Sequence, residues 1–408
     1  MNNILNYLVY LTYPLLFAMW FIGSKWHGRR KFNEEFMSAG QAKYMQGLLA
    51  VCIFLHHTAQ KTCAPWHEPL YTEHGLDLFV NMGYLFVAIF FFLSGFGLYK
   101  SYETKENYLK GFVARRILPI TLTAAVVSWI FIPVRIAMGE KLDSFRTIVY
   151  ILGLKLANPN GWYPITISMF YFVFYLCFKH IKNKNKAIAA IVVFIFIYQL
   201  IGTVVPHNDW WMQGEWWYNS VHLFWIGMIF AKNEKKVTDH LKRHYVRYMV
   251  IGGIMILVLA VLVAVCSGFF SYYYMEGVPQ VYQKIDLLAK VVGRRWVTLL
   301  SEMLCSLNFT FMFVMVNLKV KIGNPVLKFM GWISLEFYLV HGMFVEMFGF
   351  NWLDATKSLY YIRNVALYEA VVLALGIAAA LLIKLMMKPV RSFAGRSGRK
   401  DKDTEVKA

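Results

Sequence analysis

The feature that most constrains this chain is a succession of apolar runs, each about 20 residues long, separated by short polar stretches. The hydrocarbon core of a bilayer is about 30 Å thick, and a helix needs about 20 apolar residues to cross it. Hydrophobic residues make up 58% of the chain and charged residues only 16%, so these runs cannot all be hidden in one soluble core. The sequence therefore predicts an all-α, polytopic transmembrane helix bundle.

Eleven candidate spans emerge when the sequence is scanned for runs of this length. Their approximate limits are 4–23, 44–60, 78–99, 114–138, 162–180, 187–205, 217–231, 247–269, 297–318, 326–349 and 365–387. The first run lacks a small-residue cleavage site, so we expect a retained span rather than a signal peptide. The predicted organisation is an extra N-terminal helix with a basic loop (1–43), a transmembrane domain (44–390) and a disordered basic tail (391–408).

The uneven distribution of basic residues between the loops predicts the orientation of the chain. The net charge is +19, and clusters of Lys and Arg follow the odd-numbered spans. The loops after even-numbered spans carry fewer, apart from the long loop after span eight. Lys and Arg are retained on the cytoplasmic side, where anionic lipid headgroups also attract them. We therefore expect a multi-pass plasma-membrane protein with its C-terminus in the cytoplasm and its N-terminus outside, with membrane lipids and not nucleic acid as partners.

Ionisable groups inside the predicted spans point to chemistry, because such groups are costly at bilayer depth. His56 and His57 end the second span, and Tyr338 and His341 lie in the tenth. His57 and His341 each lie about 20 Å from the cytoplasmic end of their helix, at 1.5 Å per residue, and hence at similar depth. A neutral imidazole is a good general base near neutral pH. The simpler alternative is that each histidine only hydrogen-bonds a neighbouring helix.

A basic pair at the cytoplasmic start of the fourth span is a candidate phosphate site. Arg115 and Arg116 follow Lys110 there, and they either anchor the topology or clamp a phosphate, which guanidinium binds bidentately. On the preceding span Ser94 stands beside Gly95, and glycine lets another helix or a ligand approach closely. The Gly-x-Ser-x-Gly elbow of serine nucleophiles is absent around Ser94.

The outer loop after span six carries four Trp in eight residues, interleaved with carboxylates. Trp210 and Trp211 follow Asp209, and Glu215 precedes another Trp pair. Such aromatic residues suit a membrane interface, and aromatic faces with carboxylates also suit a carbohydrate ligand. Both interpretations stay open from the sequence.

These segments, taken together and in this order, resemble the membrane acyltransferase 3 family. The segments that carry the resemblance are 46–51 leading to His56 and His57, 90–97, 112–119, Trp162 and Tyr163 followed by Tyr171, and 331–341. The resemblance covers roughly residues 44–387 and makes spans two to eleven the ten-helix core of the family. The chain departs from the family pattern at Gln46, where a basic residue is usual and Lys43 lies one turn away. It departs again around Arg116, where a second arginine of an Arg-x-x-Arg pattern is missing.

The resemblance implies acyl-CoA-dependent O-acylation, usually acetylation of surface or secreted glycans, with acetyl-CoA as donor and no metal. It implies that His57 acts as general base on an acceptor hydroxyl or is itself transiently acylated. His56, His341 or Tyr338 would then orient His57 or stabilise the oxyanion. The candidate donor-binding residues are Ser94, Lys110, Arg115 and Arg116, and the candidate acceptor-binding residues are Trp162, Asp209, Trp210, Trp211 and Glu215.

Two other classes of protein remain alternatives. A transporter or flippase would use the same polar groups as a path for a substrate or protons. The sequence shows neither an inverted repeat nor a pair of Gly/Pro-broken helices in support of transport. A membrane receptor or scaffold would explain the spans but not the buried histidines.

Overall fold

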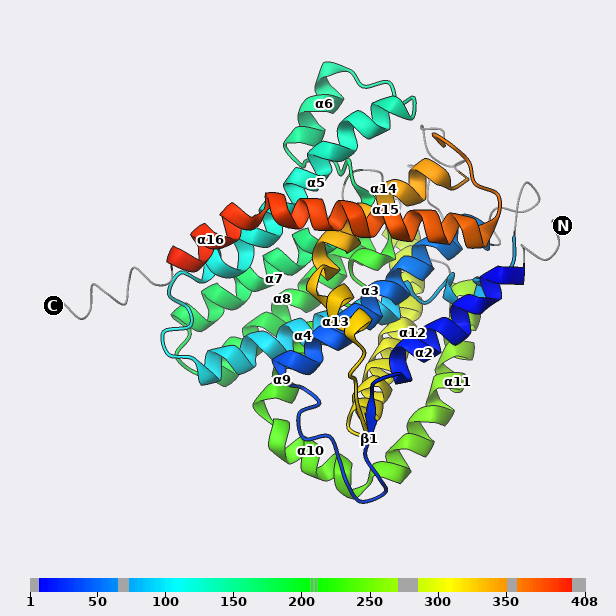
Figure 1. The fold of residues 1–408 in the computed structure, drawn as a ribbon. Coiled ribbons are helices and arrows are strands. Elements are labelled where there is room, and N and C mark those ends of the chain that lie inside the picture. The colour runs from blue at the N-terminus through cyan, green and yellow to red at the C-terminus, as the bar shows by residue number, and fades with distance from the viewer. Residues whose placement is uncertain are drawn as a thin grey trace.

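The computed structural model describes residues 7–64, 73–205, 207, 210, 212–270, 285–350 and 358–397, with only the backbone described at 285–291 and 394–397. These residues form a helical bundle (Figure 1). The α-helices are α2 (Thr12–Phe21), α3 (Ala39–Thr62), α4 (Gly83–Thr104), α5 (Leu118–Ala137), α6 (Ser144–Ile151), α7 (Trp162–His180), α8 (Lys184–Val204), α9 (Leu223–Lys232), α10 (Glu234–Arg243), α11 (Tyr245–Phe269), α12 (Ile285–Asn317), α13 (Pro325–Trp332), α14 (Ser334–Phe348), α15 (Val365–Met386) and α16 (Lys388–Ser397). The shorter elements are η1 (Leu8–Leu11), β1 (Lys25–Trp26), η3 (Asp77–Phe79), η4 (Val113–Ile117), η5 (Pro159–Gly161), η6 (Glu215–Trp217) and β2 (Val320–Lys321).

The all-α membrane bundle predicted from the sequence is confirmed. Seven helices of the described chain are long and apolar enough to cross a bilayer. They are Gly83–Thr104, Val113–Ala137, Pro159–His180, Lys184–Val204, Tyr245–Phe269, Val292–Asn317 and Val365–Met386. The first and seventh predicted spans contain shorter apolar helices, Leu8–Phe21 and Leu223–Lys232.

The second and tenth predicted spans differ from simple membrane helices for identifiable reasons. Helix α3 is 24 residues long, but it carries ionisable side chains from Lys43 to Lys61. The tenth span is not one helix, because the backbone departs from helical geometry at Ile333 between α13 and α14. Both departures lie in the two segments that hold the candidate histidines.

The seventh predicted span, 217–231, is wrong at its start, because regular α-helix begins only at Leu223. Asn219, Ser220 and His222 precede this helix and are polar and buried, and the side chains of Asn219 and His222 bond to α12. Asn219 Nδ2 donates to Glu302 Oε2 at 3.0 Å, and His222 Nε2 lies 3.2 Å from the carbonyl oxygen of Met303. These contacts hold the segment as an irregular chain inside the bundle.

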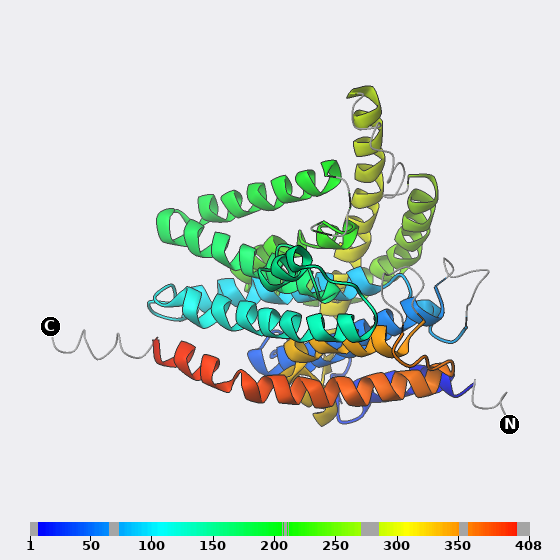
Figure 2. The same cartoon turned by 90° about the horizontal axis from the view of Figure 1, so that it is seen from above.

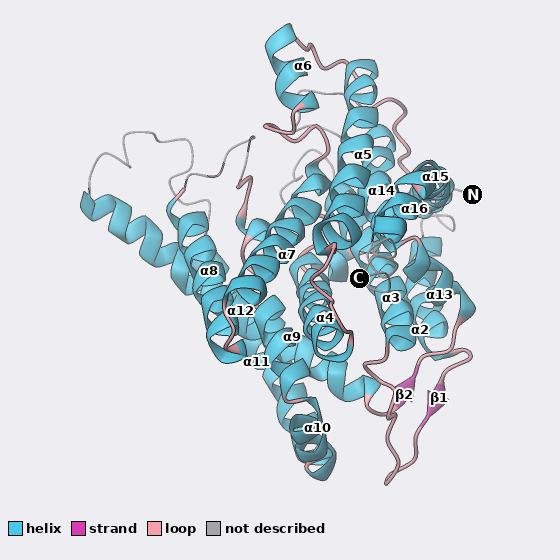
Figure 3. Ribbon diagram, turned by 90° about the vertical axis from the view of Figure 1, so that its left-hand side faces the viewer, coloured by secondary structure: helices cyan, strands magenta, loops and turns pink. Residues whose placement is uncertain are grey.

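The loops of the described chain lie at two ends of the bundle. Figures 1 and 3 show α6 at one end and α10 with the β1–β2 pair at the other. Figure 2 shows α15 and α16 along one side and α11 with part of α12 on the opposite side. In the described chain, ion pairs join neighbouring segments at each end: Lys242–Glu34, Lys321–Glu35 and Lys184–Glu103 at the α10 end, and Lys61–Glu346 and Arg363–Glu73 at the other. Which end faces the cytoplasm stays a prediction from the basic residues.

Helices α4 and α9 cross so closely that glycine is needed on both sides of the contact. A Cβ atom at Gly95 would lie 1.9 Å from the carbonyl oxygen of Phe224. A Cβ atom at Gly227 would lie 2.1 Å from the carbonyl oxygen of Phe92. Small residues allow this approach, and the packing that follows stabilises helix pairs in lipid, where no hydrophobic force acts between helices.

Replacing Gly95 with alanine is therefore expected to destabilise the bundle by about 1–3 kcal/mol, because a backbone carbonyl must move. Gly97→Ala is the matched control, since no atom lies within 4 Å of a Cβ there. Alanine at that position is expected to be neutral or to stabilise α4 by up to about 1 kcal/mol through helix propensity. Thermal unfolding of the purified variants measures the difference, and equal melting temperatures would contradict the close crossing.

Candidate active site

His57 lies on α3 and His341 on α14, the helix that follows α13. Helices α3 and α13 cross at glycines. A Cβ atom at Gly47 of α3 would lie 1.9 Å from the carbonyl oxygen of Leu327, and one at Gly331 would lie 1.8 Å from that of Lys43. This crossing fixes α3 against α13. Because α14 continues from α13 after the break at Ile333, it is carried alongside the second half of α3.

His57 and His341 are in direct contact at this place. His57 Nδ1 lies 2.7 Å from His341 Nε2, and the two rings are nearly parallel with their centroids 4.9 Å apart. His341 is fully buried, and its Nδ1 lies 2.7 Å from the carbonyl oxygen of Phe337. The two histidines, which the sequence predicts at similar depth, are therefore in contact between α3 and α14.

These contacts determine where the protons lie when both rings are neutral. The carbonyl oxygen of Phe337 can only accept a hydrogen bond, so Nδ1 of His341 must donate it. Nε2 of His341 is then an acceptor, and Nδ1 of His57 donates to it. The Nε2 lone pair of His57 is left unprotonated on a residue that lines a large cavity. This is the tautomer that a general base needs, held by a second group as in catalytic histidines.

His56, the neighbouring candidate, is directed elsewhere. Its Nδ1 lies 2.8 Å from the carbonyl oxygen of Phe79 in η3. Its ring covers Gly83 at the start of α4, where a Cβ atom would lie 2.3 Å from Nε2. His56 therefore ties α3 to the turn before α4, although it also lines the same cavity as His57.

Two cavities lie beside the histidine pair and share part of their lining. The larger has a volume of about 1220 Å³ and includes His57, and the smaller has about 200 Å³ and reaches Lys43. Ile53, Val87 and Tyr338 line both. The Tyr338 ring lies 6.4 Å from the His57 ring, and its buried hydroxyl has no hydrogen-bond partner within the described part of the chain. An unpaired buried hydroxyl thus belongs to a residue that lines both cavities.

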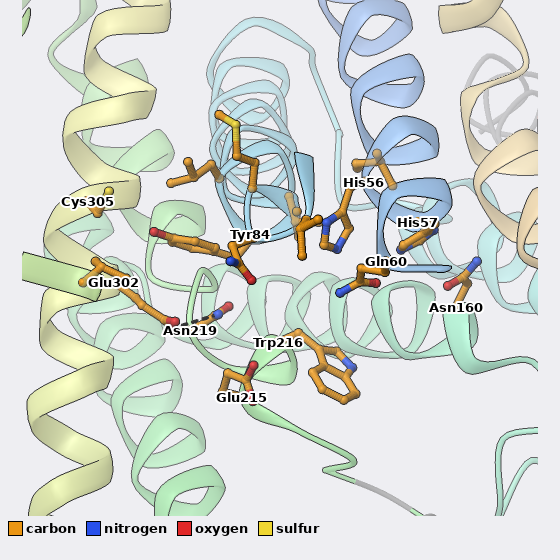
Figure 4. Close-up of a pocket in the computed structure, with 18 of the residues that line it drawn as sticks. His56, His57, Gln60, Tyr84, Asn160, Glu215, Trp216, Asn219, Glu302 and Cys305 are labelled. Carbon is orange, nitrogen blue, oxygen red and sulfur yellow. Dashed lines mark hydrogen bonds between the residues drawn. The ribbon is translucent and has the colours of Figure 1, made fainter. Parts of the chain in front are cut away.

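The larger cavity has a polar side rich in amides, carboxylates and tryptophan (Figure 4). The polar and tryptophan side chains there, besides the histidines, include Gln60, Lys61, Asn160, Trp162, Glu215, Trp216, Asn219, Glu302 and Glu346. Trp162 and Glu215, predicted for the acceptor, are among them. Trp210 is 38% exposed and faces the ring of Phe145 instead. Asp209 and Trp211 lie outside the described residues.

The polar residues of this cavity that sequence reasoning missed include Asn160, Asn219 and Glu302. Asn160 Nδ2 donates to the carbonyl oxygen of Tyr338 at 3.3 Å, and Asn219 bonds Glu302. Glu302 offered a signal, since it is a carboxylate inside a predicted span, and such residues are functional candidates by default. Asn160 and Asn219 offered none, because they lie at the edges of apolar runs.

The smaller cavity extends from Tyr338 toward the start of α3. Ser94, predicted for donor binding, lines it together with Tyr163 and Tyr171. Lys43 and Gln46 line its far end, and Lys43 Nζ donates to Gln46 Oε1 at 3.1 Å. A basic group is therefore present next to Gln46, where the sequence departs from the family pattern.

Cations outnumber carboxylates around that end of the smaller cavity. Lys43 interacts electrostatically with Lys384, Arg391 and Arg116. Glu336 is almost fully buried and forms ion pairs with Lys384, at 3.3 Å, and with Arg391. We call Lys43, Arg116, Lys384 and Arg391 the cation cluster. One carboxylate among these four cations leaves a positive field, and such a field attracts phosphate groups.

Helix α16 (Lys388–Ser397) brings Arg391 to this cluster by packing beside η4. Residues 391–397, which the sequence analysis assigned to a disordered tail, are therefore helical. Residues 398–408 lie outside the described part of the chain.

The structure separates the members of the predicted phosphate clamp. The Arg115 guanidinium donates to the carbonyl oxygens of Tyr108, at 2.9 Å, and of Lys110, and so closes the turn before η4. Arg116 lies over the ring of Tyr108, 5.7 Å from its centroid, and Lys110 is exposed in the turn. Arg116 is the member that joins the cation cluster around Lys43.

A comparison with protein families places the chain in one of them. A family profile described as an acyltransferase domain matches residues 41–386, a range that leaves α2 outside it. Helix α2 is held to the matched region by Thr12, whose hydroxyl donates to Glu369 at 3.0 Å. Among curated proteins and among solved structures, no match is found. The chain belongs to the membrane acyltransferase 3 family.

Proposed function

We propose that this protein moves an acyl group, in the simplest case acetyl, from cytoplasmic acyl-CoA to a hydroxyl of an extracytoplasmic glycan or glycolipid. The observation that carries the proposal is that two cavities share Tyr338 in their lining, with His57 beside it in the lining of the larger one. One cavity would admit the donor and the other the acceptor. The reaction would then take place beside Tyr338, away from bulk water on either side.

The proposed reaction is a single displacement assisted by His57. Nε2 of His57 takes the proton of the acceptor hydroxyl while the hydroxyl oxygen attacks the thioester carbonyl carbon. The oxygen–carbon bond forms, the carbon–sulfur bond breaks, and the leaving thiolate takes the proton back from His57 as free CoA. His341 accepts from His57 Nδ1 and favours the imidazolium that forms in between. The Tyr338 hydroxyl is the candidate donor to the oxyanion.

The donor side of the proposal rests on charge. CoA carries several phosphate groups, and Lys43 and Arg116 lie in the cation cluster at the far end of the smaller cavity. The pantetheine arm would extend past Ser94 toward Tyr338. Because basic loops are cytoplasmic, this end of the bundle is where cytoplasmic acyl-CoA would enter.

Release of free CoA by the full-length protein in membrane vesicles from cells that produce it, which supply the acceptor hydroxyl, tests the proposal directly. We expect turnover of acetyl-CoA, and a Lys43→Gln/Arg116→Gln variant with a KM for acetyl-CoA raised by about 10–150-fold, since bonds to charged groups contribute about 1.5–3 kcal/mol. Acetyl-pantetheine, which lacks every phosphate, is the control donor, and both proteins should use it equally well. If the wild-type protein released no CoA from any acyl-CoA tried, acyl transfer would be refuted and transport favoured.

A further inference from the structure

Helix α16 (Lys388–Ser397) lies outside the family profile, which ends at residue 386. Figure 1 shows α16 continuing α15 toward the C-terminus. The helix is docked on the bundle, because it packs beside η4 and α5 and its Val390 contacts the core. From this position Arg391 reaches the cation cluster. Helix α16 therefore adds a charged side chain of its own to the region that the family profile matches.

Arg391 and Lys384 share one buried counter-ion in the described chain. Glu336 accepts from Lys384 with Oε2, at 3.3 Å, and from Arg391 with Oε1. The side chain of Glu336 is 1% exposed, whereas that of Arg391 is 31% exposed. A guanidinium has several N–H donors, and the contact with Glu336 uses only Nη2 of Arg391. Glu336 thus holds the guanidinium in place while other N–H groups stay available for a second anion.

The cations of the cluster differ in their relation to the smaller cavity. Lys43 is exposed and lines the cavity, whereas Lys384 and Arg391 do not line it. Lys43 interacts electrostatically with both, so Arg391 lies near Lys43 but outside the cavity. In CoA the pyrophosphate follows the pantetheine arm, and the phosphate monoester on the ribose is farther from the thioester. A donor with its thioester at Tyr338 and its pyrophosphate at Lys43 would carry the ribose phosphate beyond Lys43, toward Arg391.

The charge of the ribose phosphate fits this place. A phosphate monoester carries a charge of about −1.5 to −2 at pH 7. Since Lys384 and Arg391 share one carboxylate, like charges stand close together here, and an added anion relieves their repulsion. Lys384 is also bonded to the carbonyl oxygen of Trp332, and a planar guanidinium can bind a phosphate through two N–H groups at once. Arg391 is therefore better suited to the phosphate than Lys384.

We propose that Arg391 of α16 binds the ribose phosphate of the acyl-CoA donor. Glu336 positions the guanidinium, and Lys43 and Arg116 are left for the pyrophosphate. The protein then prefers CoA thioesters to thioesters of carriers that lack this phosphate. This inference rests on the proposed acyl transfer, and it adds a specificity-determining residue and the group that this residue recognises.

The test combines the loss of one side chain with the loss of one phosphate. Thiol release that depends on His57 is measured in inside-out membrane vesicles with acetyl-CoA and with acetyl-dephospho-CoA, which lacks only the ribose phosphate. Arg391→Gln is expected to raise the KM for acetyl-CoA by about 10–150-fold, as for a bond between charged groups. The same variant should leave the KM for acetyl-dephospho-CoA within about twofold of wild type, because the two losses remove one interaction.

Lys388→Gln is the matched control, since it removes the same charge from an exposed residue of the same helix. Its KM for acetyl-CoA should stay within about twofold of wild type, as expected for an exposed charge screened by salt. Equal increases in the two variants would overturn the inference in favour of a diffuse positive field. An unchanged KM in Arg391→Gln would overturn it in favour of docking of α16 or a contact with a lipid headgroup.

Two further measurements separate the inference from folding and from the proposed transfer. Arg391→Gln should use acetyl-pantetheine as well as wild type does, which shows that its fold is intact. Arg391→Lys keeps the charge for Glu336 but loses the paired N–H groups, so it should raise the KM for acetyl-CoA by a smaller factor. Should the glutamine variant fail to fold, the lysine variant makes the same comparison between donors. An equal rise for both donors would overturn the inference, and absence of any release that depends on His57 would instead refute the transfer.

Discussion

Replacing His57 with alanine is expected to lower the rate of acyl transfer by about 10²–10⁴-fold, the usual contribution of a general base. The loss should fall on kcat rather than on the KM for acetyl-CoA, because His57 lines the larger cavity and the cation cluster belongs to the smaller one. Initial rates of CoA release at saturating donor and acceptor measure the effect.

His56→Ala is the matched control for His57→Ala, since the two residues are adjacent and line the same cavity. His56 is bonded to the carbonyl oxygen of Phe79 and packs on Gly83. Its loss should lower the melting temperature, as expected for a buried hydrogen bond that contributes about 0.5–1.5 kcal/mol, while kcat stays within about tenfold of wild type. If His56→Ala abolished transfer and His57→Ala did not, the assignment of the base would be reversed.

The fold class was predictable because membrane spans are encoded by length and apolarity alone. The seven long apolar helices needed no knowledge of tertiary structure. The segments around Asn219 and Ile333 were not predictable in detail, because their irregular backbone is supported by partners elsewhere in the chain. Asn219, for example, bonds to Glu302, which lies 83 positions away.

Contacts in the candidate site were predictable only where the position of a residue along its helix decides whether two side chains can meet. His57 and His341 were matched by counting residues from the cytoplasmic ends, and they are in contact. Counting cannot say which helices are neighbours or which way a side chain points. The approach of Lys384 and Arg391 to Glu336, and the direction of His56 toward η3, therefore needed the structure.

The outer-loop tryptophans differ in where they lie. Trp216 lines the larger cavity, whereas Trp210 is partly exposed beside Phe145. Glu302, a single carboxylate in an apolar run, lines the cavity that His57 also lines. In a membrane bundle the cost of one buried charge carries more information about a site than several aromatic residues at an interface.

Tyr338→Phe is expected to separate activity from stability. The variant removes one hydroxyl from a residue that lines both cavities. That hydroxyl is buried without a partner in the described chain. Loss of an oxyanion donor lowers kcat by about 10²–10³-fold. An unsatisfied buried hydroxyl costs about 1–3 kcal/mol in the folded state, so phenylalanine should maintain or raise the melting temperature.

Tyr163→Phe provides the comparison for Tyr338→Phe. The Tyr163 ring lies 5.7 Å from the Tyr338 ring. Tyr163 lines only the smaller of the two cavities, whereas Tyr338 lines both. We expect this variant to keep kcat within about tenfold of wild type, because no oxyanion donor is lost. A Tyr338→Phe protein with wild-type kcat and a lowered melting temperature would show that the hydroxyl is structural. Low activity in a protein as stable as wild type would instead indicate that the Tyr338 hydroxyl is left unpaired in the folded protein and bonds to the transition state.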